Sequence, residues 1–191
     1  MNYYINIYYI ENFFKLYNII FFMRNNILIT GGSRSGKSLF AENLTLSFGK
    51  KPTYIATANN IDEEMDNRIN LHKKRRKNNW FEYESKINLI ETIEKVNTNS
   101  PVLIDCITLW LNNIFYEKMN WKTEVEKLSI FLSNYTQPII IVTNELGSGV
   151  ISMNKLTREF QDASGITNQI LASVCDEVYS VICGIPTKIK G

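Results

Sequence analysis

The stretch GGSRSGKS, residues 31–38, constrains the fold of this 191-residue chain more than any other part of its sequence. It fits the pattern G-x-x-x-x-G-K-[ST], in which a glycine-rich loop binds phosphate groups. The apolar run NILIT at residues 26–30 precedes it, and KSLFAENLTLSF at residues 37–48 follows with apolar residues at helical spacing. Strand, loop and helix in this order are the context that the pattern requires. The sequence therefore predicts a loop that binds phosphates through backbone N–H groups and the start of a helix.

Two residues of this motif and one acid elsewhere predict how the phosphates and a metal ion are held. Lys37 is expected to neutralise the β- and γ-phosphates, and Ser38 is expected to bind Mg²⁺. Asp105 ends the apolar run VLIDC, and a carboxylate at the end of a central strand can bind Mg²⁺ directly or through water. Acids also end strands without any ligand, so Asp105 carries weight mainly because the loop is present.

Apolar, strand-like runs alternate with helix-like segments along the rest of the chain. Such alternation is typical of an α/β fold, a mostly parallel sheet with helices on both faces. No repeat or linker divides the chain after Met23, so we expect one domain over residues 23–191. The expected strands are residues 26–30, 53–58, 80–85, 102–106, 139–145 and 177–184, and the expected helices are residues 37–48, 61–76 and 154–175.

Residues 1–22 differ in kind from the rest of the chain. MNYYINIYYIENFFKLYNIIFF is rich in aromatic residues, Ile and Asn, and it lacks the basic start and cleavage site of a signal peptide. Polar residues interrupt it, whereas a spanning helix needs about 20 mostly apolar residues. We expect a misassigned start, a loose tail or a weak membrane-associating helix, without stable membrane insertion.

Charge and cysteine content narrow the class of partner. The formal net charge is only +2, so the basic character is local and favours a small anionic ligand over a nucleic acid. Cys106, Cys175 and Cys183 have no metal-ligand spacing. Reduced, mostly buried thiols in a cytoplasmic protein are the simplest interpretation.

The single histidine, His72, stands in RINLHKKRRKNNW, residues 68–80. On a helix, Arg68 and Arg76 share its face at spacings of four residues, and Arg75 follows it by three. These cations would hold a triphosphate nearby and keep the imidazole neutral and nucleophilic at neutral pH, which suits covalent catalysis. From residue type and spacing alone, an incidental surface histidine on a solvated basic helix explains the pattern equally well.

Together these segments resemble the bifunctional adenosylcobinamide kinase/adenosylcobinamide-phosphate guanylyltransferase family of cobalamin biosynthesis. The resemblance runs from Ile27 to the C-terminus, and residues 1–22 are not part of the family pattern. The patterns R-I-x-x-H-K-x-x-R-x-x-x-W around His72 and V-T-N-E-x-G-x-G at residues 142–149 are far more specific than the phosphate-binding loop. The matching segments are ILITGGSRSGKSLFAENL, YIATA, DEEMDNRINLHKKRRKNNW, VLIDCITLWLNNIF, IIIVTNELGSGVI and LTREFQDASGITNQILASVCDEVYSVICGIPTKIKG.

The resemblance implies a P-loop NTPase fold of the RecA-like type and two reactions. In the first, the aminopropanol hydroxyl of adenosylcobinamide takes the γ-phosphoryl group of ATP or GTP. In the second, His72 attacks the α-phosphorus of GTP and releases pyrophosphate, and the guanylyl group then passes to adenosylcobinamide phosphate, giving adenosylcobinamide-GDP. A homotrimer, Mg²⁺ as cofactor and no nucleic-acid partner complete the expectation.

By the resemblance, His72 and Lys37 are the catalytic residues, and Ser38 and Asp105 hold the metal. Asp105 stands where some relatives carry Glu, which keeps a carboxylate. We add from chemistry that Glu84 can accept hydrogen bonds from guanine, although a lone Glu after a strand is more often simply solvated. The implied nucleotide-binding residues are Gly31, Gly32, Ser33, Arg34, Ser35, Gly36, Lys37, Ser38, Ala56, Thr57, Ala58, Lys73, Lys74, Arg75, Arg76, Glu84 and Asp105.

Two other functions are compatible with the same residues. A P-loop small-molecule kinase without the guanylyl step would form no covalent GMP on His72. A non-catalytic nucleotide-binding switch, or a nucleic-acid-binding module that uses the patch HKKRRK, would release no pyrophosphate. The nucleic-acid-binding module would also lose affinity steeply with salt. The sequence does not decide between ATP and GTP in the kinase step.

Overall fold

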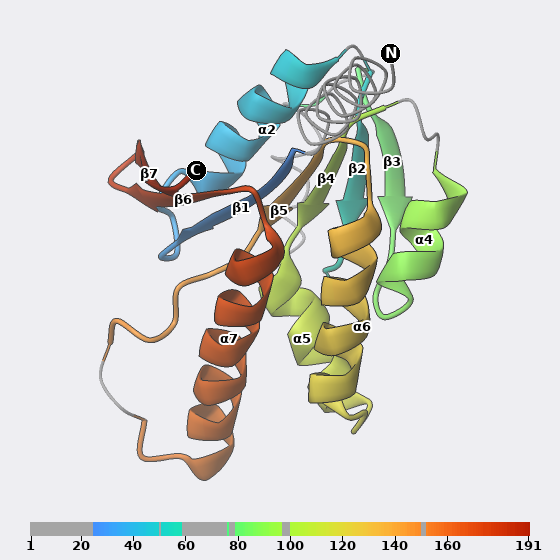
Figure 1. Ribbon diagram of the computed structural model, residues 1–191. Helices are drawn as coiled ribbons and strands as arrows, with labels where there is room; N and C mark the ends of the chain where they lie inside the picture. The colour runs from blue at the N-terminus through green and yellow to red at the C-terminus, as the bar shows by residue number, and fades with distance from the viewer. Residues whose placement is uncertain (1–24, 50, 59–75, 77–78, 97–99, 150–151) are drawn as a thin grey trace, which may run out of the picture.

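The computed structural model describes residues 25–49, 51–58, 76, 79–96, 100–149 and 152–191. Over these residues the strands form one seven-stranded sheet, in the order β3-β2-β4-β5-β1-β6-β7 (Figure 1). The elements in chain order are β1 (Asn26–Gly31), α2 (Lys37–Phe48), β2 (Thr53–Ala56), β3 (Phe81–Glu84), α4 (Leu89–Lys95), β4 (Val102–Asp105), α5 (Ile107–Tyr116), α6 (Trp121–Asn134), β5 (Ile139–Val142), α7 (Lys155–Val174), β6 (Glu177–Ile182) and β7 (Ile185–Lys190).

The sheet is parallel from β3 across to β6, and β7 pairs antiparallel with β6. β1, which leads into the phosphate-binding loop, lies between β5 and β6. Parallel strands bring their carboxyl ends to one edge of the sheet, where ligands of open α/β folds bind. At that edge Ala56 of β2 pairs with Glu84 of β3 and with Asp105 of β4. Three predicted site residues therefore end neighbouring strands.

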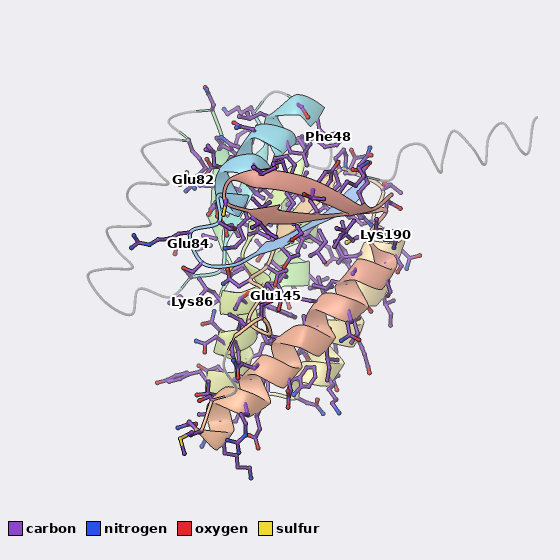
Figure 2. All side chains as sticks on the ribbon, turned by 90° about the vertical axis from the view of Figure 1, so that its left-hand side faces the viewer. Phe48, Glu82, Glu84, Lys86, Glu145 and Lys190 are labelled. Atoms are coloured by element: carbon purple, nitrogen blue, oxygen red, sulfur yellow. The ribbon has the colours of Figure 1, made fainter. Side chains whose placement is uncertain are left out.

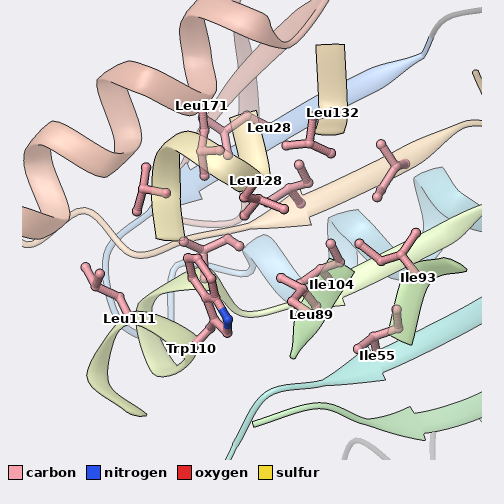
Figure 3. Close-up of a cluster of buried hydrophobic side chains, with 14 of the residues drawn as sticks. Leu28, Ile55, Leu89, Ile93, Ile104, Trp110, Leu111, Leu128, Leu132 and Leu171 are labelled. Atoms are coloured by element: carbon pink, nitrogen blue, oxygen red, sulfur yellow. The ribbon is translucent and has the colours of Figure 1, made fainter. Parts of the chain in front are cut away.

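Helices cover both faces of the sheet, as the sequence predicts. On one face α2 packs over Ile27 and Ile29 of β1. On the other face α4, α5, α6 and α7 pack over a cluster that includes Leu28, Ile55 and Ile104 (Figures 1 and 3). Successive β1 side chains thus enter opposite cores. Burial on both faces explains why the middle of each central strand is an apolar run, ILI in β1, VLI in β4 and IIIV in β5.

The strand predicted at residues 177–184 is wrong at its end. β6 stops at Ile182, which pairs with Ile185 of β7 across a two-residue turn. Cys183 and Gly184 form this turn with positive φ angles of 52° and 81°. Two positive φ angles in succession match the right-handed twist of a hairpin, so the chain reverses instead of continuing.

The strands predicted at residues 53–58 and 139–145 are also too long, because β2 ends at Ala56 and β5 ends at Val142. The predicted helices at residues 37–48 and 154–175 are α2 and α7. The predicted helix at residues 61–76 lies outside the described residues, apart from Arg76, which is helical. α4, α5, α6 and β7 have no counterpart among the expected elements. Among the described residues, none of the helices combines the length and the apolar character that crossing a membrane requires.

Candidate nucleotide-binding site

The phosphate-binding loop joins β1 to α2 as the sequence predicts. Gly36 is the N-cap residue of α2 and has a left-handed backbone, with φ 95°, and it makes no side-chain cap hydrogen bond. By contrast, the side chains of Asn120 and Asn154 accept hydrogen bonds from backbone N–H groups at the starts of α6 and α7. The first turn of α2 also contains no acid. Its N-terminal N–H groups and its dipole therefore favour an anion.

The hairpin between β6 and β7 packs against this loop and supports it. The N–H of Gly184 donates to the carbonyl of Ser35 at 2.8 Å. A Cβ added to Gly31 would lie 2.5 Å from the carbonyl oxygen of Val181, and one on Gly36 would lie 3.1 Å from the Cα of Gly184. The hairpin leaves room only for glycine at the first of these positions and crowds any side chain at the second.

Lys37 lies against the loop that it is expected to serve. Its side chain is buried, with 8% of the residue exposed, and Nζ donates to the carbonyl of Gly32 at 3.0 Å. Ser38 follows at the start of α2 and is partly buried. The hydroxyl of Ser35 is buried and has no hydrogen-bond partner among the described residues. The loop thus brings together a cation, hydroxyls and backbone donors, which are the groups that hold phosphates.

Asp105 ends β4, and the neighbouring strand β2 holds it in place. The phenol of Tyr54 donates to Oδ2 of Asp105 at 3.3 Å. Cys106, the residue after Asp105, is bound on both sides of its backbone by Thr57. The hydroxyl of Thr57 donates to the carbonyl of Cys106 at 2.6 Å and accepts from the N–H of Cys106 at 2.8 Å. Asn113 of α5 in turn donates to the carbonyl of Thr57 at 2.9 Å. Thr57, predicted as a nucleotide contact, supports the backbone beside Asp105 in this structure.

The thiol next to Asp105 is held in its protonated form at neutral pH. Burial, with the nearby Asp105 carboxylate, raises the pKa of Cys106 to about 12. Burial and the nearby Asp176 carboxylate likewise raise the pKa of Cys175 to about 12. All three cysteines are free thiols, and only Cys183 is exposed, as expected of reduced and mostly buried cysteines.

Glu84 lies further along the same edge of the sheet. It ends β3, is exposed, and pairs in register with Ala56. Figure 2 shows Glu84 and Lys86 at one side of the molecule and Glu145, which follows β5, toward its middle. The N–H of Glu145 donates to the carbonyl of Gly31 at 3.0 Å. Residues of the V-T-N-E segment therefore adjoin the start of the phosphate-binding loop.

Of the four predicted nucleotide contacts that follow His72, Lys73 to Arg76, the structure describes only Arg76. It is buried, with 4% exposed, and its Nε lies 2.9 Å from Oε1 of Glu82. Its Nη1 lies 3.7 Å from Oε1 of Glu42, and its Cζ lies 3.5 Å from the ring centroid of Tyr54. The guanidinium is thus engaged by protein groups. His72, Lys73, Lys74 and Arg75 lie outside the described residues.

The residues at this edge fit Mg²⁺ bound together with a nucleotide. Within the described ranges, no three or more His, Cys, Asp or Glu side chains gather as a protein metal cage. Mg²⁺ at nucleotide sites is usually held by one or two protein oxygens together with phosphate oxygens and water. The hydroxyl of Ser38 and the carboxylate of Asp105 are such an incomplete set.

Comparison with known proteins decides the family. The sequence matches the model of the family described as "Cobinamide kinase / cobinamide phosphate guanyltransferase" over residues 27–189. The chain belongs to this family. The match contains the phosphate-binding loop, Asp105 and the His72 segment, and it begins after residues 1–22.

Relatives of this cobinamide kinase/guanyltransferase family protein are similar over nearly their whole length. It is 37% identical over 167 residues to the bifunctional adenosylcobalamin biosynthesis protein CobP of Pseudomonas aeruginosa, covering 86% of this chain and 96% of that protein. It is 34% identical over 180 residues to the bifunctional adenosylcobalamin biosynthesis protein CobU of Escherichia coli, covering 86% and 99%. These relatives are named as bifunctional enzymes of adenosylcobalamin biosynthesis.

Comparison with solved structures agrees on the fold. A protein from Pyrococcus horikoshii OT3 superposes with a TM-score of 0.51 at 14% identity, covering 95% of this chain and 91% of that one. At this identity the likeness concerns the fold alone. Together with the loop between β1 and α2, it confirms the expected P-loop α/β fold for this cobinamide kinase/guanyltransferase family member.

The site of this family member also contains residues that sequence reasoning missed. Tyr54 and Glu42 approach Asp105 and Arg76 from β2 and α2, and Gly184 supports the loop from the hairpin. No local pattern in the sequence indicates these contacts, because each joins residues that are distant along the chain. One signal in the sequence is the charged residue Glu42, which follows Phe40 and Ala41 in the predicted helix at residues 37–48.

Proposed function

We propose that this protein phosphorylates the aminopropanol hydroxyl of adenosylcobinamide and then transfers GMP to the product through a guanylyl-histidine at His72. One observation carries the proposal: the family match spans residues 27–189 and includes a phosphate-binding loop that the structure builds at the start of α2. Asp105 ends a strand at the same edge of the sheet, two strands from β1.

In the kinase step, the substrate hydroxyl oxygen attacks the γ-phosphorus of ATP or GTP. The bond between that phosphorus and the β–γ bridging oxygen breaks, the hydroxyl proton leaves, and ADP or GDP departs. The loop N–H groups and Lys37 bind the phosphates and stabilise the charge that develops on them. Bound Mg²⁺, held by Ser38 and Asp105, would supply further charge neutralisation at the phosphate oxygens.

In the transfer step, a nitrogen of the His72 imidazole attacks the α-phosphorus of GTP, and the bond to the α–β bridging oxygen breaks. Pyrophosphate leaves, and a phosphoramidate of GMP remains on the ring. A phosphate oxygen of adenosylcobinamide phosphate then attacks the same phosphorus, and the imidazole is released. Lys73, Lys74 and Arg75, next to His72 in sequence, are proposed to bind the anionic groups, and Glu84 is proposed to accept hydrogen bonds from guanine.

We propose residues 23–191 as the working unit and a homotrimer as its assembly. The start of the family match at residue 27 supports the first of these. A chain that begins at Met23 should retain both activities, and light scattering on the purified protein should give three times the chain mass. A monomeric mass would reject the trimer without affecting the catalytic proposal.

The deciding experiment traps the covalent intermediate. The protein is incubated with Mg²⁺ and GTP labelled at the α-phosphorus, denatured and separated by electrophoresis. We expect acid-labile, base-stable label on the wild type and none on His72→Ala. GTP labelled at the γ-phosphorus should leave no label on either protein.

The outcomes separate the alternatives. A folded wild type without α-label would reject the guanylyl-histidine and favour a kinase that lacks the second step. The kinase half is checked separately, by mass spectrometry of adenosylcobinamide phosphate formed with ATP and with GTP as donor. Absence of that product with both donors would reject the kinase assignment.

A further inference from the structure

Tyr54 lies between a buried cation and the proposed metal ligand. The guanidinium of Arg76 stacks on its ring, with 3.5 Å between Cζ and the ring centroid. At the end of the ring, the phenol oxygen donates to Oδ2 of Asp105 at 3.3 Å. The ring of Trp80 meets that of Tyr54 edge to face, with 6.2 Å between centroids. One side chain thus connects the end of the predicted His72 helix to the end of β4.

The charges around Tyr54 belong to a buried cluster. Arg76 pairs with Glu42 of α2 and with Glu82 of β3, and both Arg76 and Glu42 are almost fully buried. A buried charge is expensive unless it is paired, so the two carboxylates fix where the guanidinium lies. The planar guanidinium can bind a carboxylate in its plane and stack on an aromatic ring at the same time. Arg76 therefore holds the Tyr54 ring in a defined position.

The geometry makes the Tyr54 phenol the donor in its contact with Asp105. Its oxygen lies 3.3 Å from Oδ2 of the carboxylate, which can only accept when it is ionised. A cation over the face of the ring also draws electron density from it, which strengthens the O–H as a donor.

We propose that Tyr54 is a positioning residue for the carboxylate of Asp105, and that Arg76 acts through Tyr54 by holding its ring. This inference rests on the proposed role of Asp105 in binding Mg²⁺. The phenol fixes one carboxylate oxygen and leaves the other for Mg²⁺ or for a water molecule bound to it. Partners that orient a metal ligand in this way typically contribute about 10- to 100-fold in metal affinity. The role assigned to Arg76 is indirect, and it differs from that of a phosphate ligand.

The test measures how strongly Mg²⁺ and the nucleotide help one another to bind. Calorimetry gives the Kd of a non-hydrolysable GTP analogue with Mg²⁺ and with EDTA. The Kd in EDTA divided by the Kd with Mg²⁺ is the coupling ratio. In Tyr54→Phe, which removes one oxygen and keeps the stacked ring, we expect the ratio to fall about tenfold. The Kd in EDTA should stay at the wild-type value, because no phosphate contact is lost. The same variant should recover its kinase rate at high Mg²⁺ concentration.

The chain offers a matched control for this variant. Tyr179 of β6 also donates its phenol proton to a carboxylate, Glu177, at 2.8 Å. It also packs edge to face on another ring, that of Phe40. Tyr179→Phe should therefore keep the wild-type ratio. An unchanged ratio in Tyr54→Phe, or an equal fall in both variants, overturns the proposal.

Asp105→Asn separates this inference from the function on which it rests. If Asp105→Asn removes the coupling and Tyr54→Phe does not, only the positioning role is wrong. If Asp105→Asn leaves the coupling intact, Asp105 does not serve Mg²⁺, and the positioning role fails with it. Neither outcome bears on the guanylyl-histidine, which the α-labelling experiment decides independently.

Arg76→Lys tests the indirect role. Lysine keeps the charge beside Glu42 and Glu82 but loses the planar stacking on Tyr54. We expect a lower coupling ratio, an unchanged Kd in EDTA, and no further loss when Arg76→Lys is added to Tyr54→Phe. A weaker Kd in EDTA in a folded Arg76→Lys protein would instead identify Arg76 as a direct phosphate ligand. Should this variant fail to fold, Tyr54→Phe alone decides the proposal.

Discussion

At the scale of single residues, the phosphate-binding loop depends on backbone dihedral angles and close contacts that only glycine accommodates well. Gly36 combines a left-handed φ of 95° with a neighbour, the Cα of Gly184, only 3.1 Å from where a Cβ would lie. Residues other than glycine rarely adopt such angles, and the crowding falls on backbone that cannot rotate away. The second glycine of the motif is therefore required by two independent features of the fold.

Gly36→Ala should destabilise the protein by about 1–3 kcal/mol and weaken nucleotide binding, because the strain falls on the loop itself. Gly165 is the matched control, since it is exposed within α7 and a Cβ there would meet nothing within 4 Å. Gly165→Ala should stabilise the protein by about 0.5–1 kcal/mol, as alanine is the better helix former. Urea unfolding and GTP-analogue calorimetry on both variants measure these effects. Equal stability changes in the two variants would contradict the special position of Gly36.

The residue scale is also where sequence reasoning was least complete. The loop and Asp105 are predictable, because a local pattern and the end of an apolar run point to them. In the sequence, Arg76 is one cation among several in HKKRRK. Only the structure shows that it is buried and paired with Glu42 and Glu82. The phenol of Tyr54 looks like part of an apolar strand. Both roles depend on residues from other elements, which no local pattern records.

At the scale of elements, α6 shows how one helix divides its residues between the core and the solvent. Leu128 is fully buried and belongs to the cluster that α4, α5, α6 and α7 build on the sheet (Figure 3), whereas Ile130 is 65% exposed. Two positions apart on a helix means nearly opposite faces. The two side chains are isomers with the same number of carbon atoms, so the difference in their surroundings dominates their contributions to stability.

Leu128→Ala should lower the free energy of unfolding by about 2–5 kcal/mol, because it removes buried methyl groups and leaves a cavity. Ile130→Ala, on the same helix, should change it by about 0.5 kcal/mol or less. Urea denaturation followed by circular dichroism gives both values. Similar losses in the two variants would mean that Ile130 is covered by a contact beyond the single chain.

The elements also show where periodicity succeeds and where it fails. α7 alternates apolar and polar residues at helical spacing, whereas α2 is recognised chiefly because it follows the phosphate-binding loop; both agree with expectation to within a residue at either end. The sequence predicts a strand that runs through Cys183 to residue 184 and does not predict β7, because Cys183 does not look like a turn residue and every residue of β7 is exposed. Without a buried face, β7 gives no alternating pattern to detect.

At the scale of the whole molecule, two buried cysteine thiols make the folded state less stable at alkaline pH. Burial raises the pKa values of Cys106 and Cys175 from 9.0 to about 12. Between these two values the unfolded chain loses the thiol protons while the folded chain keeps them. The stabilising contribution is therefore complete below pH 9.0 and is lost as the pH rises toward about 12.

The free energy of unfolding should therefore fall by about 1 kcal/mol for each thiol when the pH is raised from about 8 to about 10. Urea unfolding at the two pH values measures this fall. Cys175→Ala should be less stable than the wild type at both, yet should lose less between them, since one titrating group is gone. A fall as large as that of the wild type would show that Cys175 does not contribute.

The contact between the hairpin and the phosphate-binding loop has a consequence for synthesis on the ribosome. β1 and its loop are made before β5 and β6, which flank β1, and well before Gly184, which supports Ser35. Contacts between distant parts of a chain form only after both parts have been made. A nascent chain stalled before residue 184 has the whole nucleotide-binding motif but lacks the hydrogen bond from Gly184 to Ser35. We therefore expect such a chain to bind GTP more weakly than one in which the hairpin has been made.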